Sequence, residues 1–141
     1  MKQVDRVMMA HHRSRAESFL SGMKFLSDDL TTYAAAVALL AVHGAISLAD
    51  AVLIGYQGRR SREQDHRTAA IFLEKLCNSR RADRSGLKHL IWLLARKTDF
   101  SYGEQRFNQS EVKSAVLTAE RFQAWIYRTF PEVAREDQPN P

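Results

Sequence analysis

Cysteine, proline and glycine are scarce in this sequence, and each shortage excludes a class of structure. Its 141 residues include one cysteine, three prolines and six glycines. A single cysteine, Cys77, cannot form an internal disulfide, and no cysteines or histidines have the spacing of a structural zinc site, which favours a reducing cytoplasm. With so few turn-forming residues, a β-sandwich or β-barrel is disfavoured. An all-α fold is therefore expected.

The motifs of the common enzyme chemistries are also missing. The sequence has no glycine-rich phosphate loop, no nucleophile elbow and no His-Glu-x-x-His motif, so neither a cofactor nor a metal site is expected. The first 15 residues are too polar for a signal peptide. Hydrophobic residues make up 45% and charged residues 26%, which are ordinary proportions for a globular domain.

Helical periodicity organises residues 1–141 into one domain. Apolar residues recur every three or four positions in five segments, which predicts an up-and-down bundle of about five helices. The predicted helices cover residues 13–27, 33–54, 61–78, 85–97 and 109–130. Residues 1–12 are expected to form a polar extension and residues 132–141 a disordered tail.

Local signals refine two of these helices. Capping patterns place helix starts at Ser61, with Gln64 three residues on, and at Asn108, with Glu111 three residues on. The periodicity of the helix at 85–97 predicts a buried face of Leu87, Leu90, Ile91 and Leu94. The neighbouring face carries His89, Trp92 and Arg96.

The segment at 33–54 is apolar nearly all round, which is typical of a helix buried at the centre of a bundle. A transmembrane span is the weaker alternative, because His43, Ser47 and Asp50 interrupt the run. These three residues lie at i, i+4 and i+7 on one face. They are interpreted either as a satisfied structural network or as the wall of a pocket or interface. The small residues of the segment would suit a subunit contact.

Positive charge points to an anionic partner. The formal net charge is +5, with 15 arginines and six lysines. The planar guanidinium binds phosphate bidentately and stacks on bases, so RNA, DNA or a nucleotide is the expected ligand, and a GC-rich genome is the alternative explanation of the arginine content.

The richest basic segment surrounds the start of the helix at 85–97, where unpaired backbone N–H groups would favour phosphate. Its cationic residues are Arg80, Arg81, Arg84 and Lys88, and His89 follows one turn into the helix. The alternative is an ordinary solvated turn. If the helices at 33–54 and 85–97 both run antiparallel to the one between them, His89 lies level with His43. A shared site would then also include Arg84 and Asp50.

The last 60 residues resemble a HEPN domain, a family of small helical bundles found in toxins, defence ribonucleases and partners of nucleotidyltransferases. The resemblance covers residues 80–131 and is carried by LKHLIWLLARK, KTDFSYGEQRF and AERFQAWIYRTFP. Ribonuclease members of the family have an arginine, four to six residues and a histidine, a spacing that Arg84 and His89 match. Arg6 with His11 and Arg60 with His66 also match, but lie outside the resembling segment.

The resemblance implies metal-independent RNA cleavage by a homodimer. In that chemistry His89 would move a proton on or off the ribose 2′-OH, and Arg84 would stabilise the charge on phosphorus. The residues expected to contact the substrate are Tyr102, Arg81, Lys88 and Arg96, with His43, Ser47 and Asp50 behind them. The alternative is a non-catalytic regulatory module whose partner is a nucleotidyltransferase or an antitoxin. A duplex-DNA-binding protein ranks last, since no recognition helix is evident.

Overall fold

Helices account for almost all of the chain that the computed structural model describes, residues 4–58, 66–102 and 108–134. They are α1 (Arg6–Leu26), η1 (Ser27–Asp29), α2 (Leu30–Gln57), α3 (Arg67–Arg80), α4 (Leu87–Tyr102), α5 (Gln109–Thr129) and α6 (Pro131–Ala134). No strand occurs in these ranges, and the predicted all-α bundle is confirmed.

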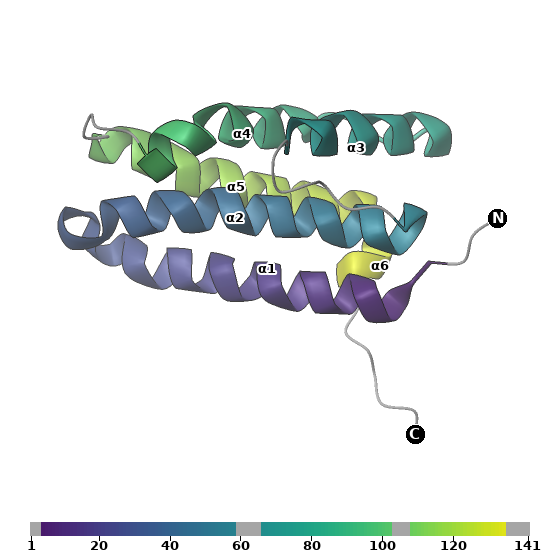
Figure 1. Ribbon diagram of the computed structural model, residues 1–141, viewed down its shortest axis with the longest axis horizontal. Helices are drawn as coiled ribbons and strands as arrows, with labels where there is room; N and C mark the ends of the chain where they lie inside the picture. The colour runs from purple at the N-terminus through teal and green to yellow at the C-terminus, as the bar shows by residue number, and fades with distance from the viewer. Residues whose placement is uncertain (1–3, 59–65, 103–107, 135–141) are drawn as a thin grey trace, which may run out of the picture.

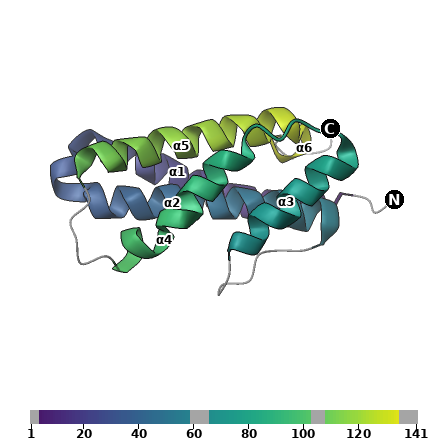
Figure 2. The same ribbon diagram turned by 90° about the horizontal axis from the view of Figure 1, so that it is seen from above.

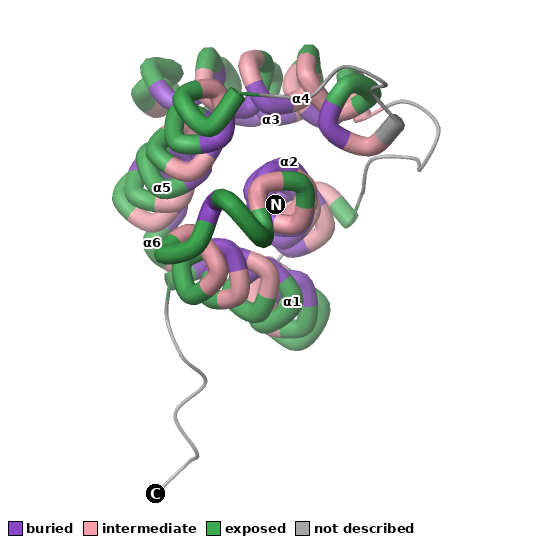
Figure 3. The backbone as a smooth tube through the Cα atoms, turned by 90° about the vertical axis from the view of Figure 1, so that its left-hand side faces the viewer, coloured by how far each residue is buried: buried purple, intermediate pink, exposed green. Residues whose placement is uncertain are grey.

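α2 lies at the centre of the bundle, as its sequence predicts. It contacts α1 on one side, α5 on another, and α3 and α4 above (Figure 1), and Figure 3 shows it end-on among them. The helix starts at Leu30 because the Asp29 carboxylate accepts a hydrogen bond from the Thr32 backbone N–H at 3.2 Å. It ends at Gly58, whose φ of 65° favours glycine.

The small residues of α2 are used inside the chain. A Cβ atom on Gly44 would lie 2.5 Å from Leu20 Cδ2, so α1 packs directly against the α2 backbone there. The fully buried alanines of α2 are Ala38, Ala41, Ala45, Ala49 and Ala51. These six residues are therefore occupied by contacts within the chain, and the subunit contact expected of this segment stays a prediction.

One described helical stretch, Arg6–Gln57, is long and apolar enough to cross a membrane. Its most apolar window has a mean hydropathy of 2.1, and 72% of that window is buried inside the protein. A core helix passes the same test.

α1 begins seven residues earlier than predicted, so the expected polar extension is wrong for residues 6–12. Asp5 caps the helix by accepting a hydrogen bond from the Met8 backbone N–H at 3.1 Å. The Asp5 backbone N–H also donates to the Gly55 carbonyl at 2.7 Å, which ties the start of α1 to the end of α2. Met9 then packs against Gly55 and is 1% exposed. These contacts between distant segments have no signal in the local sequence.

α3 and α4 form a second layer that crosses the other helices obliquely (Figure 2). α3 and α4 run in opposite directions, and α4 starts beside α5 and passes over α2. The start predicted for α3 at Ser61, with its capping partner Gln64, lies outside the described residues. α3 ends at Arg80, and Arg81 follows with a φ of 53°.

α4 differs from its prediction in length and in face. It continues to Tyr102 through part of the segment expected to be irregular, and Phe100 is buried in that extension. Ile91, expected in the core, is 54% exposed, and Leu93 is buried instead. The oblique crossing turns a different side of α4 toward α2 and α5.

α5 starts as predicted and ends with an addition. The Asn108 side chain accepts a hydrogen bond from the Glu111 backbone N–H at 2.7 Å, which confirms the cap. Pro131 ends α5 and begins α6, in which Val133 is fully buried. The predicted disordered tail is therefore wrong for residues 132–134.

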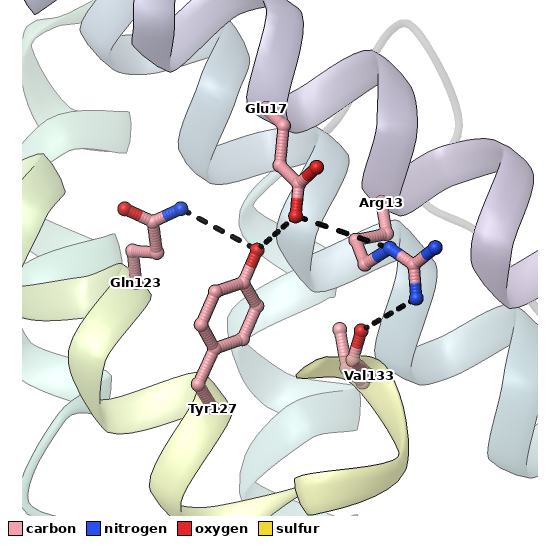
Figure 4. A network of polar contacts seen from close by, with 5 residues as sticks. All are labelled: Arg13, Glu17, Gln123, Tyr127 and Val133. Atoms are coloured by element: carbon pink, nitrogen blue, oxygen red, sulfur yellow. Dashed lines mark hydrogen bonds and ion pairs between the residues drawn. The ribbon is translucent and has the colours of Figure 1, made fainter. Parts of the chain in front are cut away.

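A polar network ties α1 to α5 and α6 (Figure 4). The Tyr127 hydroxyl donates to Glu17 at 2.9 Å, and Arg13 donates to the Val133 carbonyl at 3.3 Å. Gln123 donates to the Tyr127 hydroxyl at 3.4 Å. Burial and the neighbouring Glu17 carboxylate raise the pKa of Tyr127 to about 12.

Candidate functional site

The start of α4 is fixed in place by Trp125 of α5. The Trp125 indole N–H donates to the Asp83 carbonyl at 3.2 Å. The indole also packs so closely on Gly86 that any Cβ there would overlap the ring. Asp83 in turn accepts hydrogen bonds from the Ser85 backbone N–H at 3.0 Å and hydroxyl at 2.7 Å. The turn that carries the predicted catalytic arginine is thus held from beneath.

Arg84 points toward α3. Its guanidinium donates to Asn78 Oδ1 at 3.2 Å and lies 3.9 Å from the Glu74 carboxylate. The side chain is 58% exposed, so both contacts are at the surface and each contributes at most about 1 kcal/mol. In this arrangement Arg84 is paired with α3 rather than with His89.

His89 lies one turn into α4 and is partly exposed. Partial burial lowers its pKa, and the positive charges of Lys88 and Arg121 lower it further, which favours the neutral imidazole. Arg121 belongs to α5, and nothing in the local sequence of either helix signals that it lies near His89. Lys88, His89 and Arg121 are called the α4–α5 cationic group below.

The two cations of this group, Lys88 and Arg121, form no ion pair within the part of the chain that the structure describes. Both side chains are exposed. Arg81, at the other end of the turn, is likewise exposed and without an ion pair in these ranges. By contrast, Arg128 lies 3.8 Å from the Asp83 carboxylate. The group therefore has positive charge available for an anion.

No protein family model matches the chain, and no curated protein matches it.

Arg96, predicted to contact the substrate, is already engaged. Its guanidinium lies 3.7 Å from the centre of the Trp92 ring, and it donates to the Trp92 carbonyl at 3.1 Å. It also lies 3.7 Å from the Glu111 carboxylate at the start of α5. Arg96 thus links α4 to α5. Tyr102 ends α4, and its side chain lies outside the described residues.

His43, Ser47 and Asp50 lie along the least buried side of α2. The His43 ring lies 6.2 Å from the Phe19 ring of α1, Ser47 is buried, and Asp50 is partly exposed. The charges that act on His43 are those of Lys97, His66 and Arg15, and they share no residue with the neighbours of His89. The two histidines thus have separate surroundings. The expected convergence assumed parallel axes, whereas α4 crosses α2 obliquely.

The described ranges contain no evident metal-binding site. No group of three or more histidine, cysteine, aspartate or glutamate side chains there could hold a metal ion. Cys77 is buried near the end of α3, and burial raises the pKa of its thiol, which makes it a core residue rather than a nucleophile.

Proposed function

We propose that the protein binds single-stranded RNA or a nucleotide at the α4–α5 cationic group. The observation that carries this proposal is that two exposed cations on different helices, Lys88 and Arg121, both act on His89 and form no ion pair among the described residues. Phosphate contacts of this kind supply most of the affinity of proteins for nucleic acids and little sequence discrimination. We therefore expect binding that depends strongly on salt and weakly on base sequence.

Base stacking is expected to contribute less to binding than phosphate contacts do. The Trp92 ring lies one turn beyond His89, where an aromatic side chain would stack on a base. Arg96 lies over that ring, so a base on that face would have to displace the guanidinium. Phosphate recognition is accordingly the main contribution.

We extend the proposal to metal-independent cleavage of the bound RNA, as the HEPN resemblance implies. A neutral His89 at pH 7 would accept the proton of the ribose 2′-OH, and the cations beside it would stabilise the developing charge on phosphorus. Arg84 would join them only after it leaves Asn78 and Glu74, which costs little because both contacts are exposed.

Fluorescence anisotropy with a labelled single-stranded RNA tests binding. The double variant Lys88→Ala/Arg121→Ala should bind weakly, and its slope of log affinity against log salt should be shallower by about 1.4, two phosphate contacts being lost. Lys24→Ala/Lys113→Ala removes the same charge from exposed positions elsewhere and is the matched control. If the two variants bind alike, binding comes from net charge alone.

Cleavage is tested separately, with the same RNA in EDTA. We expect cleavage that Arg84→Ala and His89→Ala each abolish while binding persists. Cleavage that both variants retain would remove the assignment, and binding without any cleavage would leave the protein as an RNA-binding module.

A regulatory or interaction module is the second candidate. It is favoured by two large apolar side chains near the cationic group, Ile91 at 54% and Leu117 at 46% exposure. An antitoxin or a nucleotidyltransferase as partner belongs to this candidate, whereas the homodimer belongs first to the RNA-cleavage proposal. Light scattering of the wild type and of Ile91→Ser/Leu117→Ser tests self-association: a dimer that the variant loses would support it.

A further inference from the structure

α1 lies at the edge of the bundle, on the side away from α3 and α4 (Figure 1, Figure 3). Its outer side begins and ends with an apolar side chain in water, Val7 at 76% and Phe25 at 80% exposure. No other large apolar side chain among the described residues is more than 54% exposed. Its inner side is buried and consists of Met9, His12, Ala16, Leu20 and Met23. The two most exposed large apolar side chains of the described chain thus lie on one helix.

Val7 and Phe25 point in the same direction and are joined by a line of exposed residues. They are 18 positions apart, which is five turns of 3.6 residues. Between them an exposed residue follows every three or four positions, the spacing of the a and d positions of a coiled coil. This line, called the α1 stripe below, consists of Val7, His11, Ser14, Ser18, Ser21 and Phe25. It contains no lysine, arginine or carboxylate, and its serines are short enough to let a second helix approach closely.

The α1 stripe is symmetric about position 16, where Ala16 faces the core. Its members form three pairs equally spaced about that position: Val7 with Phe25, His11 with Ser21, and Ser14 with Ser18. A two-fold axis at this level therefore places Val7 opposite Phe25 of a second, antiparallel copy, and brings the serines of the two copies together in the middle. In a symmetric dimer each surface must be complementary to itself. A second copy of the chain is therefore the partner that this pattern favours.

We propose that the protein forms a reversible homodimer by antiparallel pairing of the α1 stripes. Association removes Val7 and Phe25 from water at both ends of the contact, which is its main driving force. α1 has 21 residues, so the stripe covers a strip about 30 Å long and about 10 Å wide on each copy. Such an area is small for a specific interface, and we therefore expect a dissociation constant in the micromolar range or weaker.

Charge beside the stripe makes the dimer sensitive to salt. Arg15 is exposed next to the stripe, on the side where the antiparallel arrangement places Arg15 of the second copy. These like charges oppose association, so the dimer should be stronger at higher salt concentration. Binding of the same helix to an anionic membrane would respond in the opposite way, because salt weakens the attraction of its cations to lipid headgroups.

Sedimentation velocity of the full chain over a range of concentrations measures the association. We expect a monomer–dimer equilibrium that Val7→Ser/Phe25→Ser weakens by about tenfold or more, because the apolar contacts at both ends are lost. Ile91→Ser/Leu117→Ser makes a similar change on α4 and α5 and is the matched control, which should dimerise as the wild type does. Arg15→Ser should dimerise more strongly than the wild type at low salt.

Disulfide cross-linking tests the antiparallel register. In the proposed dimer Val7 lies opposite Phe25 of the second copy, whereas the two Val7 residues are about 27 Å apart along the helix. A mixture of the Val7→Cys and Phe25→Cys proteins should therefore form a mixed disulfide dimer under mild oxidation, and neither protein alone should. The native Cys77 is buried and serves as the background in every sample.

The proposal is overturned if the wild type is monomeric at every concentration, or if Val7→Cys alone cross-links as readily as the mixture. A dimer that Ile91→Ser/Leu117→Ser loses and Val7→Ser/Phe25→Ser keeps would also overturn it, since the contact would then lie on α4 and α5. A monomeric wild type that binds phosphatidylserine vesicles through Phe25 would assign the face to a membrane instead. None of these results would bear on RNA binding at His89, because α4 lies on the other side of α2 from α1.

Discussion

His89 and His43 differ in what surrounds them. His89 lies at the start of α4, and the charges of the exposed Lys88 and Arg121 act on it. The His43 ring lies 6.2 Å from the Phe19 ring, and the charges that act on it are those of Lys97, His66 and Arg15. Burial is the largest contribution to the lowered pKa of each.

The difference arises from the path of α4 across the bundle. α4 starts beside α5 and passes over α2 (Figure 2). The charge of Arg121 on α5 acts on His89 in the first turn of α4, and the charge of Lys97, nearer the other end of α4, acts on His43 of α2. One helix therefore contributes to the surroundings of both histidines without joining them. Helices at the same height in a bundle share a site only when their crossing angles bring the same faces together.

Removing the Trp125 side chain should disturb the surroundings of His89 more than any other substitution. Trp125 is 2% exposed and supports both Asp83 and Gly86, so Trp125→Ala leaves a large cavity beneath the start of α4. We expect the free energy of unfolding to fall by about 3–5 kcal/mol, measured by urea denaturation. RNA affinity of the folded protein should also fall, and the pKa of His43 should not change.

Trp125→Phe is the milder substitution at the same position. It keeps an aromatic ring beneath Gly86 and removes the hydrogen bond to the Asp83 carbonyl, at a cost of about 1 kcal/mol. A loss below 1 kcal/mol for Trp125→Ala would contradict the supporting role.

A methyl group at position 86 tests the close packing of Trp125 against Gly86. In Gly86→Ala the new Cβ would overlap the buried indole, which cannot move aside, so we expect a loss of about 1–3 kcal/mol in thermal or urea unfolding. Gly22→Ala, inside α1, is the control, because its Cβ would make an ordinary contact with Leu40 Cδ1 at 3.5 Å. That variant should be about 0.5–1 kcal/mol more stable. Equal effects of the two would refute the close contact.

Tyr127→Phe acts away from both histidines and should have the smallest effect. Losing the bond to Glu17 costs about 1 kcal/mol at pH 7. Because the pKa of Tyr127 is about 12 in the fold against 10.0 for an ordinary tyrosine, its stabilisation is complete below pH 10 and is lost between pH 10 and 12. The wild type should therefore lose stability faster than the variant over that range, and parallel curves would contradict the raised pKa.

Much of the fold could be predicted because local patterns specify it. The apolar run of α2 predicts a central helix, and Asn108 with Glu111 predicts the start of α5. The errors occur where contacts between segments that are distant in the sequence determine the structure. Met9 packs on Gly55 and extends α1, and Val133 is buried and extends order past Pro131. Neither contact leaves a periodic signal.

The candidate site was less predictable. The basic residues at the start of α4 are evident in the sequence. Arg121 is one arginine among 15, and its charge acts on His89 only because α5 packs beside α4. Arg84 pairs with α3, a contact between residues six and ten positions apart across a turn. Where side chains meet depends on helix crossing angles, which composition and spacing do not determine.

The separation of the two histidines is tested most directly by NMR titration of the ring protons of His43 and His89, assigned with His43→Gln and His89→Gln. The ligand is a single-stranded RNA with hydroxyl groups at both ends, so that it carries no terminal phosphate. We expect it to raise the pKa of His89 by about one unit and to leave that of His43 unchanged. If both pKa values rise together and saturate at the same RNA concentration, the two histidines belong to one site and the account is wrong.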